Sequence, residues 1–121
     1  LAGHLQSRGT APTIAVTTGN GITAAAIAAS NTDTTGTITT TGTNDNVGAT
    51  VLTVTFTKAY AFAPKVFLEP ANAAGARGDA TGRPYVSSST TTTFVVTIPA
   101  SATAAATPSW RYFVVESGSA T

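Results

Sequence analysis

The stretch ATVLTVTFT, Ala49 to Thr57, alternates between apolar side chains and threonines. Successive side chains of an extended chain point to opposite sides, so Leu52, Val54 and Phe56 share one face. The threonines share the other face. Such alternation is typical of an antiparallel strand with one face on the core and one in solvent. The stretch therefore predicts a half-buried antiparallel strand.

Shorter period-two patterns occur on both sides of this stretch and are separated by turn residues. We expect further strands at residues 13–18, 22–30, 36–41, 65–69, 85–89, 92–99 and 110–116. Threonine favours these assignments because its branched Cβ fits the surface of a sheet better than a helix. The residues Gly19–Asn20–Gly21 are suited to positive φ, and we expect them to form a hairpin turn.

The alanine-rich segment Ile22 to Ser30 allows two interpretations. Alanine is the best helix former, so the segment fits a two-turn helix. It lacks the long apolar side chains that would give a helix an amphipathic stripe, and we favour a strand. The chain then has about eight short strands separated by turns, which predicts an all-β fold, namely an antiparallel, jelly-roll-like β-sandwich.

The composition limits the class of protein. A chain of 121 residues fits one domain, and 42% hydrophobic against 9% charged residues argues against disorder. The charged fraction lies far below the ~25% of ordinary soluble domains, so mainly hydroxyl and amide groups meet the solvent. The net charge is +1 and the basic residues are scattered, so we expect no nucleic-acid partner. No apolar run approaches the ~18 residues of a membrane span, and we expect no membrane insertion.

The segment WRYFVVE, Trp110 to Glu116, is apolar on both faces of the predicted last strand. Alternate residues place Trp110, Tyr112 and Val114 on one face and Arg111, Phe113 and Val115 on the other. One core covers only one face, so the other needs a second surface, and another subunit is the simplest cover. The candidates for the core or for a subunit interface are Trp110, Tyr112, Phe113 and Val115, with Trp110 and Tyr112 the better candidates for packing.

Five stretches together resemble a known family. They are HLQSRGTAPT from His4, GTITTTGT, ATVLTVTFTKAYAFAPKVFLEPANAA from Ala49, PYVSSSTTTTF from Pro84, and WRYFVVE. In this order they resemble a small C-terminal domain of phage and prophage tail fibres and tailspikes. The resemblance implies an obligate homotrimer at the distal end of a fibre in the virion, acting as a folding clamp, a receptor-contacting head, or both.

The resemblance also implies a domain organisation and partners. Residues 1–12 are expected to be a linker or shaft exit that leads from the rest of the fibre or virion, and residues 13–121 the head domain. We therefore expect the chain to be a piece of something longer, and a bacterial surface glycan or another host receptor to be its ligand.

Loops beside the predicted strands supply the candidates for receptor binding. The loop GARGDATGR, Gly75 to Arg83, is more polar than the alanine-rich loop typical of the family, which makes it a candidate for individual specificity. Tyrosines beside loops can stack on sugar rings. The receptor-binding candidates are Tyr60, Arg77, Asp79, Arg83 and Tyr85. Three weak sites held together in a trimer would gain affinity through avidity.

Groups for catalysis and metal binding are sparse. The chain has one histidine and five carboxylates in separate segments, whereas a glycosidase needs two carboxylates about 5 to 9.5 Å apart. We expect no enzyme, no catalytic residue and no cofactor. The triplets Asn31–Thr32–Asp33 and Asn44–Asp45–Asn46 offer oxygen ligands, but calcium takes about six to eight of them. Turn formation is the favoured interpretation, and we expect no metal site, although an ion on a three-fold axis stays open.

Two other functions stay open at this point. The domain can be a pure trimerisation clamp or a capsid-decorating head fibre that binds no receptor. Alternatively, it can be a carbohydrate-binding module of a secreted protein. Sedimentation separates this last function from the others, because such modules are usually monomeric.

Overall fold

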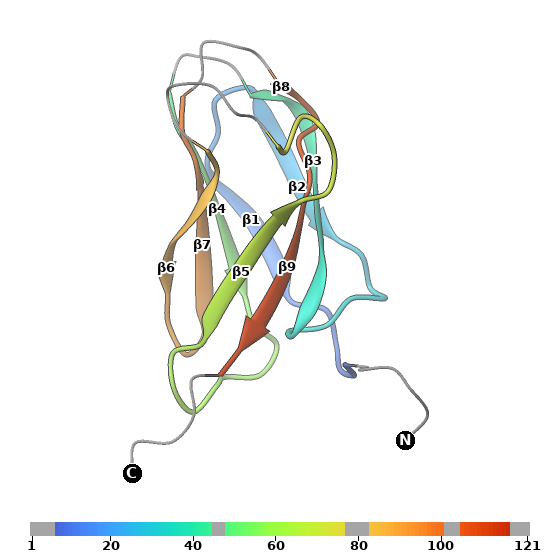
Figure 1. The fold of residues 1–121 in the computed structure, drawn as a ribbon, viewed down its shortest axis with the longest axis vertical. Coiled ribbons are helices and arrows are strands. Elements are labelled where there is room, and N and C mark those ends of the chain that lie inside the picture. Colours follow the sequence, from blue (N-terminus) through green and yellow to red (C-terminus); the bar gives the residue numbers. More distant parts are fainter. Residues whose placement is uncertain (1–6, 45–47, 77–82, 101–104, 117–121) are drawn as a thin grey trace.

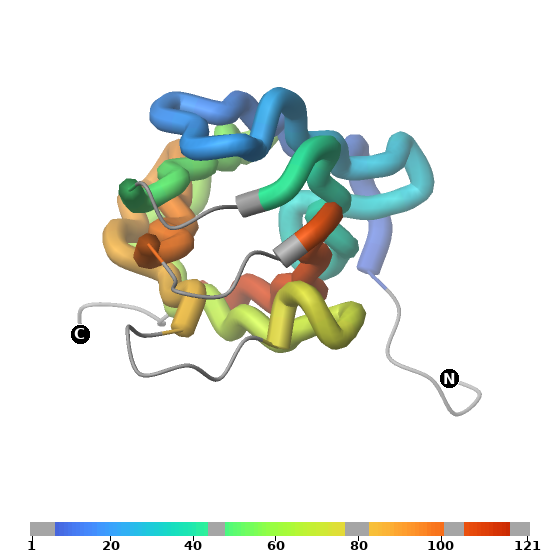
Figure 2. The backbone as a smooth tube through the Cα atoms, turned by 90° about the horizontal axis from the view of Figure 1, so that it is seen from above, coloured from blue at the N-terminus to red at the C-terminus, as the bar shows by residue number. Residues whose placement is uncertain are grey.

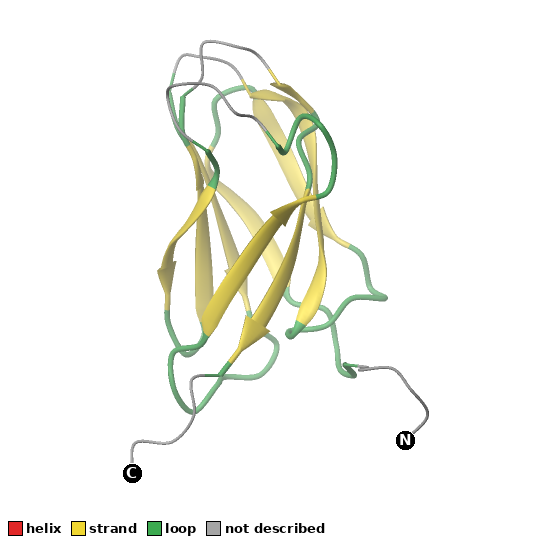
Figure 3. Cartoon of the chain, viewed as in Figure 1, coloured by secondary structure: helices red, strands yellow, loops and turns green. Residues whose placement is uncertain are grey.

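The computed structural model describes residues 7–44, 48–76, 83–100 and 105–116. These residues form nine strands and no helix (Figures 1 and 3). The strands are β1 (Thr13–Thr18), β2 (Ile22–Ile27), β3 (Thr35–Asn44), β4 (Thr50–Thr55), β5 (Lys65–Pro70), β6 (Tyr85–Ser89), β7 (Thr93–Ile98), β8 (Ala105–Ala106) and β9 (Trp110–Val115). The all-β prediction is therefore confirmed.

The strands form two antiparallel sheets. Sheet A has the order β1-β4-β7-β6, and sheet B has the order β2-β3-β9-β5, with β8 paired to the end of β3. Seen from above in Figure 2, the β1–β2 segment lies on the opposite side of the molecule from β5 and β9. A jelly roll places its first and last strands side by side in one sheet, whereas β1 and β9 lie in different sheets here. The jelly-roll part of the prediction is wrong, because alternation identifies the buried face of a strand but not its neighbours.

The core lies between the two sheets. Its buried residues are Ile38, Leu52, Val54, Phe56, Phe94, Val96, Ile98, Trp110, Tyr112 and Val114. The Phe94 ring on β7 joins the sheets, since its centroid lies 5.7 Å from that of Phe56 and 5.6 Å from that of Tyr112 on β9. Full burial of each large apolar side chain stabilises the fold by about 1.5–3 kcal/mol. The shared apolar face predicted for Leu52, Val54 and Phe56 is thus confirmed as a core face, and Trp110 and Tyr112 pack in the core as expected.

The turn Gly19–Asn20–Gly21 does not close a hairpin. β1 pairs with β4 and β2 pairs with β3, so the turn carries the chain from sheet A to sheet B. Gly21 has the positive φ (86°) expected for this turn. Asn20 fixes the crossing to the start of β4, because its side-chain Nδ2 donates to the Ala49 carbonyl at 2.6 Å and its backbone N donates to Thr50 Oγ1 at 3.1 Å.

Two strand ends differ from the prediction by three residues, and one strand is additional. The alanine-rich segment is a strand, but β2 ends at Ile27 and not at Ser30. β3 ends at Asn44 and not at Thr41, and in this extension Gly42 has a φ of 104° and passes close to the Gly21 carbonyl. β8 is a two-residue strand that lies outside the strands expected from the sequence. All three depend on pairing between distant segments, which local pattern does not contain.

The described part of the predicted linker packs against the domain. Pro12 is buried, and Thr57 Oγ1 donates to the carbonyl oxygens of Thr10 and Ala11 at 3.3 and 3.0 Å. This segment and the end of β9 lie at the same end of the molecule, the lower end in Figure 1, whereas β8 lies at the opposite end.

Candidate functional site

Charge on the strands is confined to two neighbours in sheet B. Of the nine strands that the structure describes, only β5 and β9 contain charged residues, namely Lys65, Glu69 and Arg111. The remaining strands consist of apolar, hydroxyl-bearing, glycine and asparagine residues. Because the described strands meet solvent mainly with threonine, the charges on β5 and β9 single out one surface of the sheets.

The register of β5 and β9 places these charges beside exposed apolar side chains. Lys65 is opposite Val115, Phe67 is opposite Phe113, and Glu69 is opposite Arg111. All six are exposed, because the alternate residues of both strands are the ones that pack toward the core. We call these six residues the β5–β9 face. Threonines of β3 extend it, since Thr35 is opposite Phe113 and Thr37 is opposite Arg111.

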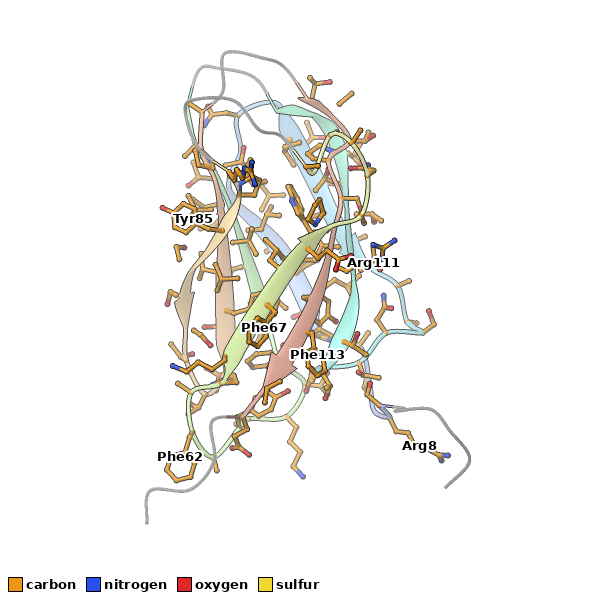
Figure 4. All side chains as sticks on the ribbon, in the orientation of Figure 1. Arg8, Phe62, Phe67, Tyr85, Arg111 and Phe113 are labelled. Atoms are coloured by element: carbon orange, nitrogen blue, oxygen red, sulfur yellow. The ribbon has the colours of Figure 1, made fainter. Side chains whose placement is uncertain are left out.

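The centre of the β5–β9 face is aromatic. Phe67 is 60% exposed and Phe113 is 41% exposed, and Val115 in the next row is also 41% exposed. Figure 4 shows the two phenyl rings on adjacent strands, with Arg111 further along β9. Isolated exposed apolar residues are ordinary, but several in one patch mark a surface that contacts another molecule.

An ion pair borders the aromatic centre. Arg111 Nη1 donates to Glu69 Oε1 at 3.0 Å, and the side chains are 58% and 71% exposed. An exposed pair of this kind contributes only about 0–1 kcal/mol to stability. Among the residues that the structure describes, the other guanidinium N–H groups and the second carboxylate oxygen have no protein partner. The pair therefore presents hydrogen-bond donors and acceptors at a defined position.

Two shallow hollows meet at Arg111. The first has a volume of about 570 Å³ and is lined by Thr35, Phe67, Leu68, Glu69, Pro70, Arg111, Tyr112 and Phe113. The second has a volume of about 470 Å³ and is lined by Thr37, Thr39, Thr40, Ala71, Asn72, Thr107, Ser109 and Arg111. Both volumes fall within the roughly 300–1,000 Å³ range of ligand sites. One hollow is aromatic and the other is rich in hydroxyl groups.

Asn72 holds the wall of the second hollow. Its Oδ1 accepts from the backbone N atoms of Gly75 and Ser109 at 2.8 and 3.1 Å, and its Nδ2 donates to the Thr107 carbonyl at 3.0 Å. Trp110 secures the same loop from the core, because its Nε1 donates to the Gly75 carbonyl at 3.1 Å. The hollow is thus part of the rigid fold, although it lies beside a long loop.

A third hollow, of about 660 Å³, is lined by the N-terminal segment and the loop after β4. These two segments lie at the lower end of the molecule in Figure 1. Both carboxylates on its wall are occupied. Asp33 accepts from the backbone N atoms of Thr57 and Lys58, each at 2.9 Å. Glu116 Oε1 accepts from the backbone N atoms of Ala61 and Phe62 at 2.7 and 3.1 Å. These carboxylates hold the loop in place.

Tyr60, one of the receptor-binding candidates, lines this third hollow and is half-buried. Its ring packs edge-on against Phe56 at 4.8 Å, and its hydroxyl donates to the Asp33 carbonyl at 3.2 Å. Burial raises the pKa of the Tyr60 phenol, and a hydrogen bond with Thr34 opposes that rise. These are the contacts of a packing residue. Receptor binding by Tyr60 stays a prediction.

The other candidates are dispersed. Tyr85 is 52% exposed at the start of β6, and Arg83 is exposed just before it. Arg77 and Asp79 lie outside the described residues. Trp110 and Tyr112 lie in the core, while the predicted interface residues Phe113 and Val115 belong to the β5–β9 face. Within the described ranges no group of three or more His, Cys, Asp or Glu side chains is placed to hold a metal.

The sequence alone did not identify Phe67 and the Glu69–Arg111 pair as site residues. In the expected strand 65–69, Lys65, Phe67 and Glu69 alternate with Val66 and Leu68, so all three lie on one face. The pattern does not contain the register of β5 with β9. That register brings the outward residues of the two strands together on one surface.

Comparisons of the chain with family models, with curated proteins and with solved structures gave no match. Among the residues that the structure describes, no helix is long and apolar enough to span a membrane.

Proposed function

We propose that the chain is the distal domain of a phage tail fibre or tailspike, a non-enzymatic part of the virion that recognises a host-surface glycan as a homotrimer. The observation that carries this proposal is the β5–β9 face, where all strand-borne charge of the described strands and three of the five exposed large apolar side chains gather. The resemblance to tail-fibre domains supplies the biological setting. The β-sandwich gives the face a rigid support.

The residues of β5 favour contact with a ligand through side chains over backbone pairing with another strand. β5 is an edge strand of sheet B, and an apolar edge strand invites pairing with other chains. Lys65 and Pro70, at the two ends of β5, are residues that proteins use to block such pairing. Phe67 stays exposed between them. The strand thus discourages edge pairing while it displays an aromatic ring.

A homotrimer suits a shallow site of this kind. Few contacts form at an open face, so a single copy is expected to bind a glycan only weakly. Three copies on one fibre turn the second and third contacts into intramolecular events with an effective concentration in the millimolar range. Repetition of surface glycans on a bacterium then gives strong attachment from weak sites.

A pure trimerisation clamp is the second candidate function, and the apolar character of Phe113 and Val115 favours it. In that arrangement sister copies cover the β5–β9 face and no receptor reaches it. The substitution Phe113→Ser separates the two functions in sedimentation equilibrium. Glycan recognition predicts an unchanged association constant, whereas a clamp predicts at least a tenfold weaker association, since a buried Phe side chain contributes about 1.5–3 kcal/mol.

Binding to whole bacteria tests the proposed function. The chain, fused at its N-terminus to a fluorescent protein, is incubated with a panel of strains, and bound fluorescence is measured. We expect binding to at least one strain that survives protease treatment of the cells and is lost after periodate, which cleaves vicinal diols of sugars. Binding to no strain, or binding that protease removes and periodate leaves, contradicts glycan recognition. Glycan binding by a chain that sediments as a monomer favours a free carbohydrate-binding module.

A further inference from the structure

We propose that the β5–β9 face and the adjoining hydroxyl-lined hollow form one groove for an uncharged oligosaccharide of at least two sugar rings. This inference rests on the proposed glycan recognition and specifies where the glycan lies and which class it belongs to. It depends on three features: the aromatic pair, the ion pair and the hydroxyl groups that line the second hollow.

The aromatic pair provides a platform for the apolar face of a pyranose. Phe67 and Phe113 are opposite each other on neighbouring strands, so their Cβ atoms are about 4.5–5.5 Å apart. Both rings line the first hollow. A sugar ring that covers them removes apolar surface from water at about 25 cal/mol per Å². The phenyl rings carry no hydroxyl, so this end of the groove selects the C–H face of a sugar.

The ion pair provides the polar half of the same subsite. Glu69 and Arg111 form the row next to the aromatic row, about 7 Å along the strands. With one contact between them, the guanidinium keeps donors and the carboxylate keeps an acceptor for a ligand. Two neighbouring hydroxyls of one sugar can therefore accept from Arg111 and donate to Glu69.

The charge balance of the groove favours an uncharged ligand. Arg111 is already neutralised by Glu69 at 3.0 Å. A carboxylate on the sugar would approach Glu69 as well, and like charges at this distance repel. Lys65 lies two rows from Glu69, about 13 Å along β5, on the other side of the aromatic row. It is too far away to compensate for a negative charge at the ion pair.

The second hollow extends the groove across the sheet. Arg111 lines both hollows, and Thr37 lies directly opposite it on β3. From β5 to β3 the groove spans two strand spacings, about 10 Å. Thr37 and Thr107 contribute hydroxyls that have no hydrogen-bond partner within the described part of the chain. A second sugar ring beside the first meets these hydroxyls.

Nuclear magnetic resonance titration of the ¹⁵N-labelled chain tests the groove. The probe is the delipidated surface polysaccharide of a strain that the chain binds, used as fragments in native form and after chemical reduction of its carboxyl groups to alcohols. We expect shifts confined to amides of β3, β5, β9 and the loop that contains Asn72. The carboxyl-reduced fragments are expected to bind with a dissociation constant within twofold of the native fragments.

Two pairs of variants locate the site. Phe67→Ala and Arg111→Gln are expected to weaken binding at least tenfold. The matched controls are Tyr85→Ala, which removes an exposed aromatic residue from sheet A, and Lys58→Gln, which removes an exposed charge from the loop after β4. Both controls are expected to bind within twofold of the original chain. Unchanged amide positions outside the face verify that each variant is folded.

Three results overturn the inference or its basis. If Tyr85→Ala abolishes binding and Phe67→Ala does not, the groove is wrong while glycan recognition stands. If carboxyl reduction weakens binding more than tenfold, the ligand is an acidic sugar and the uncharged class is wrong. If no strain shows periodate-sensitive binding, the proposed function itself fails, and the groove fails with it.

Discussion

The outer faces of the two sheets present different kinds of side chain to the solvent. On sheet A, hydroxyl groups bond to each other across the strands: Thr17 and Thr53 join through their Oγ1 atoms at 2.7 Å, and Thr97 Oγ1 donates to Ser87 Oγ at 2.8 Å. The strands of sheet A carry no charge. On sheet B, the β5–β9 face exposes two phenyl rings beside an ion pair.

The difference shows what threonine does in this chain. Cross-strand hydroxyl pairs stabilise a sheet locally and leave a neutral surface that attracts little. A fold covered in this way has no structural need for exposed phenylalanine. The aromatic rings on β5 and β9 are therefore best explained by contact with another molecule. We expect the two faces to differ in function while they share one fold.

The largest effect is expected at the residue that joins the two sheets. Phe94→Ala should lower the free energy of unfolding by about 3–5 kcal/mol, because it opens a cavity between Phe56 and Tyr112. Urea unfolding followed by Trp110 fluorescence and by circular dichroism should give one shared transition. The control Val95→Ala, on the outer side of β7, should change stability much less. Two separate transitions would mean that the faces belong to independently folding sheets.

A smaller effect is expected beneath the β5–β9 face. The Tyr112 hydroxyl donates to the Thr32 carbonyl at 2.6 Å, so Tyr112→Phe leaves a buried acceptor unpaired and should lower stability by about 1–3 kcal/mol. Burial also raises the pKa of the Tyr112 phenol above its usual value of 10.0, so the unfolded chain loses this proton first as pH rises. The contribution of this group to the free energy of unfolding should be fully present below about pH 10. Above that pH the free energy of unfolding should fall, by at most about 1.4 kcal/mol per pH unit for this group.

Denaturant unfolding from pH 8 to pH 11 checks this dependence. In Tyr112→Phe the alkaline loss should shrink to the part contributed by other groups, among them Tyr60, whose phenol pKa is also raised. An alkaline slope identical in the original chain and in the variant would exclude Tyr112 as its source.

Much of the fold follows from local pattern, and the candidate site does not. The alternation in residues 49–57 identifies Leu52 and Val54 as core residues without knowledge of any partner strand. The positive φ at Gly21 is equally local, because glycine permits it. The position of the turn in the fold, however, depends on the distant acceptor atoms of Ala49 and Thr50, to which Asn20 donates. Pairing between distant strands decides such questions, and sequence pattern does not encode it.

The site illustrates the same limit. Phe67 and Arg111 lie more than 40 residues apart, and each alone resembles an ordinary surface residue. Phe67 and Arg111 lie on one surface because of the antiparallel register of β5 and β9. A shift of β5 by one residue would turn Phe67 toward the core. The loop residues Arg77 and Asp79 lie outside the described part of the chain, and their role stays a prediction.

A modest effect is expected on the hydroxyl face of sheet A. A double-mutant cycle of Thr17→Val and Thr53→Val should give a coupling energy of about 0.2–1 kcal/mol, since each single change removes one member of a cross-strand hydrogen bond. Thermal unfolding measures the coupling, and glycan binding should stay unchanged in all three variants. A loss of glycan binding in any of these variants would place the ligand on sheet A and not on the β5–β9 face.

The smallest effect on stability is expected at the ion pair, where the effect on binding should be large. Glu69→Gln keeps the shape of the side chain and removes an exposed charge, so the free energy of unfolding should change by no more than about 1 kcal/mol. The amide has only one acceptor oxygen in place of two, and it no longer fixes the Arg111 guanidinium electrostatically. Glycan binding measured by titration should therefore weaken severalfold, while the matched change Glu116→Gln, at the lower end of the molecule, should leave binding intact. If Glu69→Gln lowers stability but binds the glycan normally, the ion pair stabilises the fold and does not contribute to binding. The β5–β9 face would then differ from sheet A in composition but not in function.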